Sequence, residues 1–239
     1  MSSDRISDPF AFADLVRQVP DLAAKERCQD SLLAFVEHHW SVVEPAVHLR
    51  KGYLLESICD HLQAVTDGYI RRLLINVPPG CTKSLLTDCF WPAWEWGPCN
   101  RPHERYLCVS YASHLTERDN ERCLNVIRSD RYQKLWGRRF SLLTHSAGRV
   151  KFTNDKTGWK LASSVGGTVL GERGSRIILD DPNSTSDIES DATRYRTELF
   201  FSEVLPDRLS NLEEDAIVII IHMAPTLRMR LPRHLSCLG

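Results

Sequence analysis

The sequence has no C-x-x-C pair, no apolar run long enough to cross a membrane and almost no net charge. Its eight cysteines stand singly along 239 residues, so the ligand spacing of a zinc site is missing. A chain of this length without a signal peptide is not expected to carry a disulfide framework either. The formal net charge of −1 excludes an overall basic field for nucleic acid. We therefore expect a cytoplasmic protein with reduced, mostly buried thiols and no membrane segment.

The sequence does have the composition of a globular protein, with 42% hydrophobic and 26% charged residues. Apolar stretches of strand length alternate with amphipathic stretches of helix length over residues 51–221. This alternation predicts an α/β domain with a mainly parallel central sheet flanked by helices. A helical region is expected before it, over residues 1–50, and an irregular basic tail after it, over residues 222–239.

The individual elements follow from local patterns. Six stretches rich in apolar and β-branched residues predict strands: "RRLLINV", "RYLCVSYA", "RVKFTN", "GWKLASSV", "SRIILDD" and "DAIVIII". Helices are expected over residues 53–68, 83–97, 114–137, 144–149 and 190–204. Gly68 is expected to close the first helix, Pro92 to end or kink the second, and Ser190 or Asp191 to cap the last.

One short stretch has several features of a phosphate-binding loop. The segment "NVPPGCTKSLL", residues 76–86, joins a predicted strand to a predicted helix and contains a Lys-Ser pair. On the pattern G-x-x-x-x-G-K-[ST], Lys83 and Ser84 match, whereas Val77 and Thr82 occupy the two glycine positions. A Pro-Gly turn followed by a helix with an exposed lysine is the alternative interpretation.

The backbone of this segment can supply the donors that a phosphate needs. Pro78 and Pro79 have no N–H group, but they fall at the entry of the loop, and every residue from Gly80 to Leu85 has one. Free N–H groups at the start of a helix bind anions. The residues that we expect around the phosphates are Pro79, Gly80, Cys81, Thr82, Lys83, Ser84 and Leu85.

A pair of carboxylates ends another predicted strand. The stretch "RIILDD" closes with Asp180 and Asp181, about 100 residues after the Lys-Ser pair. In P-loop ATPases one carboxylate at a strand end holds Mg²⁺, and a neighbouring one polarises the attacking water. Asp180 fits the first role and Asp181 the second. A strand that ends in a polar Asp-Pro turn is the alternative, but loop and carboxylates together favour a nucleotide site.

In this order the motifs resemble the ATPase domain of the terminase large subunit of tailed bacteriophages and prophages, which powers DNA packaging. The resemblance covers residues 50–221 through "RRLLINVPPGCTKS", "YLCVSYASHLTERDNERCLNVIRSDRYQKLWG" and "GWKLASSVGGTVLGERGSRIILDDP". It implies a P-loop NTPase fold of the ASCE type, with three α/β/α layers. It implies ATP and Mg²⁺ as ligands. Lys83 and Ser84 would bind phosphate and Mg²⁺, Asp180 would coordinate Mg²⁺, and Asp181 would be the catalytic carboxylate.

The resemblance also implies partners: double-stranded DNA, a portal protein and the terminase small subunit, around a homo-oligomeric ring in the cytoplasm of a bacterial host. Arg173 precedes the carboxylate strand, where an arginine can reach a neighbouring subunit's γ-phosphate. A plain loop arginine is the alternative there. Asp181 stands where many members have glutamate. Trp40 or His48 are candidates for stacking on adenine, and the three tryptophans within residues 91–96 are expected in the core or an interface.

The end of the sequence departs from the family pattern. After "AIVIII" members continue with a polar coupling motif and a nuclease domain of ribonuclease H-like fold, whereas residues 222–239 read "HMAPTLRMRLPRHLSCLG". We hypothesise that a frameshift replaced the continuation, which the encoding DNA tests, and we expect no DNA cleavage by this chain. A helicase-type or recombination P-loop ATPase, and an inactive prophage remnant that binds nucleotide without turnover, are the alternatives.

Overall fold

A seven-stranded sheet organises the chain, of which the computed structural model describes residues 9–165, 171–182, 195 and 197–222. The strands are β1 (Arg72–Val77), β2 (Arg105–Ser110), β3 (Leu142–Ala147), β4 (Lys151–Asn154), β5 (Trp159–Ser164), β6 (Arg176–Asp180) and β7 (Ala216–His222). Their order in the sheet is β1-β7-β6-β2-β5-β4-β3. The first five of this order run parallel, and β4 and β3 add antiparallel pairs. The predicted α/β class with a mainly parallel sheet is confirmed.

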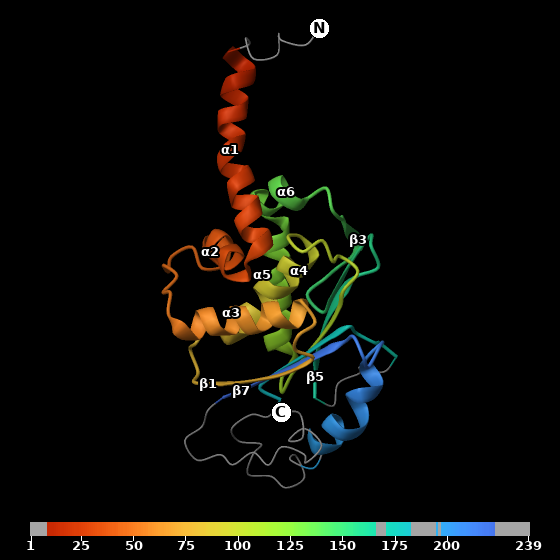
Figure 1. Ribbon diagram of the computed structural model, residues 1–239. Coiled ribbons are helices and arrows are strands. Elements are labelled where there is room, and N and C mark those ends of the chain that lie inside the picture. The colour runs from red at the N-terminus through yellow and green to blue at the C-terminus, as the bar shows by residue number, and fades with distance from the viewer. Residues whose placement is uncertain (1–8, 166–170, 183–194, 196, 223–239) are drawn as a thin grey trace.

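Helical segments accompany this sheet, and those next to it cover both of its faces. They are α1 (Pro9–Asp30), α2 (Leu32–Val43), α3 (Tyr53–Thr66), the π-helix η1 (Leu85–Phe90), α4 (Trp91–Trp96), α5 (Ser113–Arg128), α6 (Asp130–Trp136), the π-helix η3 (Phe200–Val204) and the 3₁₀-helix η4 (Pro206–Arg208). Helices α3, α4 and α5 lie over one face, and η3 with η4 lies against the other (Figure 1). Gly68 follows α3 with a φ of 83°, as predicted for its closing glycine.

β6 shows why its sequence is a continuous apolar run. Ile178 faces the larger core, which contains the side chains of α2 to α5. Ile177 and Leu179 point the other way, into a second core with Phe200 and Leu205. A strand that is buried on both faces loses the polar alternation of a half-exposed strand. The apolar run therefore predicts a central strand, and β6 lies between β7 and β2.

The parallel strands bring the two sequence motifs to one edge of the sheet. β1 leads into the loop at residues 78–82, which Lys83 follows at the start of a helical segment, and β6 leads directly into Asp181. β7 lies between β1 and β6 and runs in the same direction. The loop and the carboxylates therefore meet at the carboxyl edge, which is where open α/β sheets bind their ligands.

The predicted long helix over residues 114–137 is two helices. Ser129, between α5 and α6, has an extended backbone with φ −61° and ψ 142°. Its hydroxyl accepts a hydrogen bond from the Tyr132 N–H at 3.3 Å. Serine is a strong N-cap, because its side chain replaces a missing helical acceptor. The prediction was wrong at this residue because helical spacing alone does not show a cap inside an amphipathic run.

Pro92 does not end its helix. Residues 85–90 form wide π turns, in which the Trp91 N–H donates to the Leu86 carbonyl, and α4 continues from there through Pro92 to Trp96. Proline is tolerated in the first turn of a helix because its missing N–H has no helical partner there. The change from π to α register places Pro92 in such a first turn.

Two further predictions have different outcomes. Residues 144–149 do not form a helix, because most of them belong to β3, the edge strand that pairs with β4 through Ala147 and Phe152. Tertiary pairing outweighs local propensity in such a short, polar strand. The predicted cap at Ser190 or Asp191 lies outside the described residues.

Candidate phosphate-binding site

The loop after β1 adopts a glycine-like backbone without the expected glycines. Gly80 has a φ of 81° and Thr82 a φ of 60°. Thr82 occupies the second glycine position of the phosphate-loop pattern, and it takes the left-handed conformation that glycine favours. For a β-branched residue this conformation costs about 1–2 kcal/mol. Strain of this kind persists where the surroundings require one loop shape, as they do at binding sites.

Lys83 and Asp181 form an ion pair across this site. The Lys83 Nζ lies 3.0 Å from Asp181 Oδ2 and 3.3 Å from Asp181 Oδ1. The two side chains are only 5% and 14% exposed. Asp181 also has a left-handed backbone, with φ 45°. The structure thus brings together two residues that the sequence predicts to act at one site.

Asp180 lies in an environment that disfavours its charge. Burial raises the pKa of its carboxyl to about 7, and the nearby charge of Asp88 adds to this effect. A hydrogen bond from the Ser84 hydroxyl and the charge of Lys83 act in the opposite direction. The Oδ1 atom of Asp180 is buried and has no hydrogen-bond partner among the described residues. Such a carboxylate oxygen is suited to a cation.

Asp88 is a buried carboxylate that the sequence analysis did not single out. It lies one helical turn beyond Ser84, and Thr87 Oγ1 donates to its Oδ2 at 3.0 Å. Burial raises the pKa of Asp88, whereas the buried ammonium of Lys160 on β5 lowers it. The i, i+4 spacing from Ser84 is the signal that could have placed Asp88 on the same helix face.

Three buried oxygens near the carboxyl edge have no hydrogen-bond partner within the described part of the chain. They are Asp88 Oδ1, Asp180 Oδ1 and the Ser110 hydroxyl. Ser110 ends β2 and is in register with Asp180 on β6. Buried polar atoms are nearly always satisfied in folded proteins, so several unsatisfied oxygens together indicate a place for water or a ligand.

The residues at this edge fit a Mg²⁺ ion that is coordinated both by protein oxygens and by the oxygens of a phosphate. Asp180 offers the unsatisfied carboxylate oxygen and Ser84 a hydroxyl. Within the described ranges no group of three or more His, Cys, Asp or Glu side chains is placed to hold a metal ion. Mg²⁺ in nucleotide sites needs no such cage, because one or two protein oxygens, substrate phosphates and waters complete its shell.

The other candidates from the sequence lie elsewhere. Arg173 is exposed on the segment before β6. Trp40 is a core residue, because its Nε1 donates to the Val47 carbonyl at 2.6 Å and its ring stacks on Phe90. It is therefore not free to stack on adenine, while His48 is exposed. The tryptophans at 91, 94 and 96 are at most 2% exposed, as expected for core residues.

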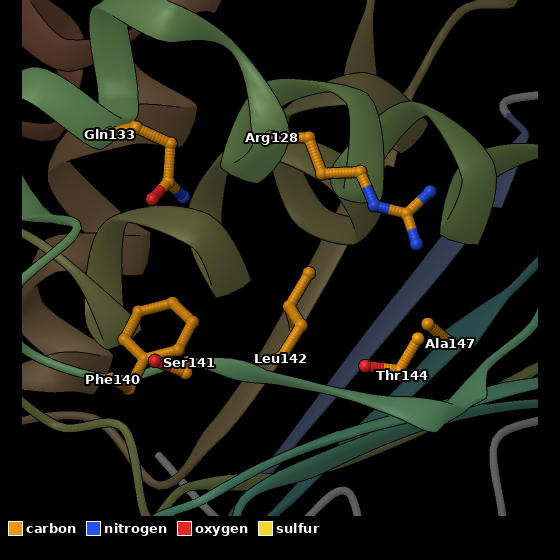
Figure 2. A pocket seen from close by; sticks show the side chains of 7 residues that line it. All are labelled: Arg128, Gln133, Phe140, Ser141, Leu142, Thr144 and Ala147. Carbon is orange, nitrogen blue, oxygen red and sulfur yellow. The ribbon is translucent and has the colours of Figure 1, made fainter.

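A separate hollow of about 460 Å³ lies between the end of α5, α6 and β3 (Figure 2). Its lining residues are Arg128, Gln133, Phe140, Ser141, Leu142, Thr144 and Ala147. β3 stands at the opposite end of the strand order from β1. The hollow is therefore not part of the site formed by the loop and the carboxylates, and we assign it no role.

We expect Asp180→Asn to stabilise the nucleotide-free protein, and to do so more at pH 8 than at pH 5. The folded protein holds a proton on Asp180 up to about pH 7, whereas the unfolded chain releases it near the ordinary pKa of 3.8. Stability therefore falls as the pH rises through this window, and asparagine removes that loss, which amounts to about 4 kcal/mol at pH 8. Urea unfolding at both pH values measures it.

The matched control for this variant is Glu213→Gln, which neutralises an exposed carboxylate away from the site. It should change the free energy of unfolding by less than about 0.5 kcal/mol at either pH. An equal gain in the free energy of unfolding for Asp180→Asn at pH 5 and pH 8 would contradict a raised pKa of the Asp180 carboxyl in the folded protein.

Comparisons with known proteins add no relative: no family model and no curated protein sequence matches the chain. Among the described residues, none of the helices has the length and apolar character that crossing a membrane requires.

Proposed function

We propose that the chain is a Mg²⁺-dependent ATPase of the P-loop NTPase class. More specifically, we propose that it is the ATPase part of a terminase large subunit, which powers the packaging of viral double-stranded DNA into proheads. The observation that supports this most is the buried Lys83–Asp181 pair at 3.0 Å. It joins the end of the loop after β1 to the carboxylate after β6.

The strand order supports the choice of class. β7 is inserted between the strand that precedes the loop and the strand that carries the carboxylates, as expected for the ASCE type. The left-handed backbone at Thr82 supports the loop assignment, since it supplies the shape that the missing glycine would give. Helices on one face and η3 with η4 on the other agree with three layers.

Each residue then has a defined role in ATP hydrolysis. The N–H groups from Gly80 to Leu85 bind the phosphates, and the Lys83 ammonium neutralises charge on the terminal ones. Asp181 orients the water that attacks the γ-phosphate in line with the leaving oxygen. Ser84 and Asp180 would hold Mg²⁺, which supplies electrostatic stabilisation of the phosphate oxygens when bound.

The larger assembly is part of the same proposal. Subunits would form a homo-oligomeric ring on the portal protein in the bacterial cytoplasm, with the small subunit and double-stranded DNA as partners. Arg173 is proposed as the residue that reaches the nucleotide of a neighbouring subunit, and its exposure before β6 is compatible with such a contact. No nuclease activity is proposed for this chain.

The test is binding and turnover of Mg²⁺-ATP by the purified chain, alone and with linear double-stranded or single-stranded DNA. Lys134→Ala is the control variant, because Lys134 is exposed on α6 and pairs with Asp21. We expect binding in both proteins, and turnover that double-stranded DNA stimulates. Unwinding with stimulation by single strands would favour a helicase-type ATPase instead. Binding without turnover would favour an inactive remnant, and no binding by a folded chain would refute the proposal.

A further inference from the structure

A triphosphate brings more negative charge to the site than Lys83 alone can balance. The Lys83 ammonium is also paired with Asp181. P-loop ATPases commonly add an arginine that stabilises the charge of the terminal phosphate. The position of α5 shows which residue of this same subunit can supply that charge.

α5 starts beside the carboxylate pair. β2, which leads into α5, pairs with β6 so that Ser110 is in register with Asp180. The Tyr111 N–H donates to the Asp181 carbonyl at 3.2 Å. Helix α5 begins two residues later, at Ser113. Its first turns therefore adjoin the carboxyl edge of the sheet, where the loop and both carboxylates lie.

Arg118 lies on the second turn of α5, away from the face that packs on the sheet. That face is marked by Thr116, whose hydroxyl donates to the Ser163 carbonyl at 3.1 Å, and by Asn120, which is fully buried. The Arg118 side chain is 48% exposed. Helical side chains lean toward the N-terminus of their helix. For Arg118 this direction leads toward the carboxyl edge.

Asp119 holds the Arg118 guanidinium in a defined plane. Its carboxylate is 3% exposed and accepts hydrogen bonds from Arg118 Nε at 3.0 Å and Arg118 Nη2 at 2.9 Å. A two-point contact of this kind sets the orientation of the planar fork. The bond to Asp119 raises the pKa of Arg118, and the charges of Asp180 and Asp88 add to it. The guanidinium therefore lies in the field of the carboxylates at the phosphate site.

We propose that Arg118 is a cis-acting arginine of the nucleotide site, whose guanidinium contacts the terminal phosphate of bound ATP, and that Asp119 is its positioning residue. The inference rests on the proposed function and deepens it. It is separate from the role of Arg173, which would act on a neighbouring subunit. Arg118 serves its own subunit because β2 and β6 of one chain place α5 next to Asp180.

Arg122 offers a matched control on the same helix. It lies one turn further on, and its Nη1 donates to the same Asp119 carboxylate at 3.1 Å. Its Nη2 lies 3.6 Å from Glu44, directly after α2, rather than toward the phosphate site. Arg122→Gln therefore removes one positive charge and one bond to Asp119, but no contact to phosphate.

The experiment compares the affinities for Mg²⁺-AMP-PNP and Mg²⁺-ADP, together with ATP turnover, in wild type, Arg118→Gln, Arg118→Lys and Arg122→Gln. We expect wild type and Arg122→Gln to prefer the triphosphate analogue. Arg118→Gln should lose about 10-fold or more of this preference and about 100-fold of turnover, while its ADP affinity stays within about 3-fold. Arg118→Lys should recover part of the preference. Melting temperatures confirm that each variant is folded.

Two outcomes would overturn the inference. Equal losses in Arg118→Gln and Arg122→Gln would mean that both arginines act only by satisfying Asp119. Equal weakening of AMP-PNP and ADP binding in Arg118→Gln would remove the contact to the terminal phosphate. A wild type that binds neither nucleotide refutes the proposed function itself, and so is distinguishable from a failure at Arg118 alone.

Discussion

Asp181→Asn is expected to abolish ATP turnover and, at the same time, to tighten nucleotide binding. Asp181 is the only carboxylate that an ion pair within the described residues joins to Lys83, at 3.0 Å. A phosphate must take over this ammonium, so the carboxylate competes with the ligand. Asparagine keeps the shape and removes the competing charge, which should tighten binding by about 10-fold. Without a carboxylate to orient the water, turnover should fall by about 1,000-fold or more.

Lys83→Ala is the variant that separates this explanation from general damage to the site. It should lose turnover to a similar extent, but it should weaken nucleotide binding, because the ammonium itself contacts the phosphates. Equilibrium binding of a fluorescent ATP analogue and release of phosphate measure the two effects, with Lys134→Ala as the exposed control. If Asp181→Asn weakens binding as Lys83→Ala does, the ion pair does not compete with nucleotide.

The expected changes in nucleotide affinity, tighter for Asp181→Asn and weaker for Lys83→Ala, have a mechanistic consequence. In the structure the Lys83 ammonium and the Asp181 carboxylate form an ion pair, and their side chains are only 5% and 14% exposed. In the proposed function a phosphate that binds Lys83 weakens this ion pair, and the Asp181 carboxylate then orients the water. In the proposed mechanism the residue that binds the substrate therefore controls when the water-orienting carboxylate acts, through the single ion pair between Lys83 and Asp181.

The sequence predicts those parts of the site that depend on order along the chain. Apolar runs place β1 and β6 inside a parallel sheet, so Lys83 and Asp181 must come to the same edge. The role of Gly68 at the end of a helix can also be predicted, because a glycine after an amphipathic stretch commonly ends a helix. These predictions succeed because each sequence pattern lies within a few residues of the strand or helix end that it predicts.

The shape of the loop could not be predicted in the same way. Thr82 takes a φ of 60°, which is unfavourable for threonine, and local propensity therefore argues against it. The conformation therefore depends on the folded surroundings of the loop rather than on local propensity. The missing glycines weaken the sequence motif, although the backbone takes a conformation that glycine would favour.

The buried charges behind the site were missed for a related reason. Lys160 on β5 is fully buried, and its ammonium donates to Asn120 on α5, with Asp88 on η1 close enough to affect its pKa. A lysine in a strand is normally expected at the surface. Its partners lie on other elements, so spacing along a single chain does not reveal them, and a buried charge is acceptable only with such partners.

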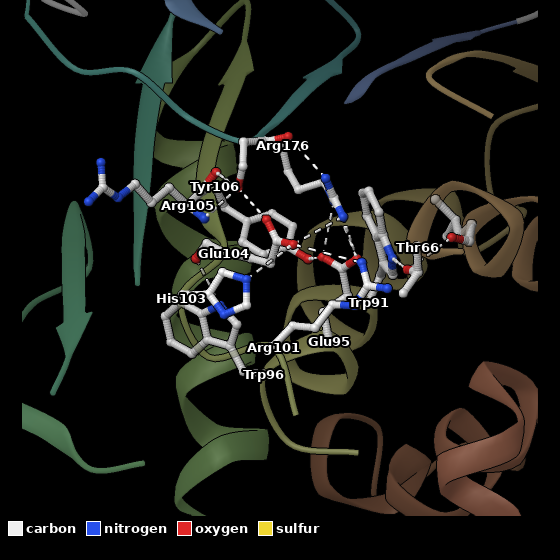
Figure 3. A network of polar contacts seen from close by, with 12 residues as sticks. Thr66, Trp91, Glu95, Trp96, Arg101, His103, Glu104, Arg105, Tyr106 and Arg176 are labelled. Atoms are coloured by element: carbon white, nitrogen blue, oxygen red, sulfur yellow. Dashed lines mark hydrogen bonds and ion pairs between the residues drawn. The ribbon is translucent and has the colours of Figure 1, made fainter. Parts of the chain in front are cut away.

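Arg176→Met is expected to destabilise the fold by about 4 kcal/mol. Figure 3 shows the Arg176 guanidinium directed at Glu95 and Glu104, and its Nη2 lies 3.0 Å and 3.3 Å from their carboxylates. All three side chains are nearly buried, and the Tyr106 hydroxyl donates to Glu95 as well. Methionine fills the space but removes the buried cation, which leaves Glu104 with the more distant Arg101 and His103 side chains at 4.0 Å and 3.9 Å. Urea unfolding at pH 8 measures the loss.

The pH dependence of that loss identifies its cause. Burial, followed by the charge of Glu95, already raises the pKa of Glu104, and Arg176 opposes the rise. In Arg176→Met the folded state loses the charge that opposes this rise, so the pKa of Glu104 should lie further above its ordinary value there. The variant then gains stability as the pH falls, so its deficit relative to wild type should be smaller at pH 5 than at pH 8. A deficit that is equal at both pH values would indicate lost packing instead.

Arg105→Met is the control, because Arg105 extends away from this network and donates to the Thr157 carbonyl near the surface (Figure 3). It should lower the free energy of unfolding by less than about 1 kcal/mol.

The Arg176 network also has a connection to the nucleotide site. Glu95 lies near the end of the helical segment that starts at the loop, and Arg176 begins the strand that ends at Asp180. The buried Arg176–Glu95 pair therefore joins these two elements at the ends that lie away from Lys83 and Asp181. Loss of the pair should also weaken nucleotide binding at temperatures where the variant is still folded.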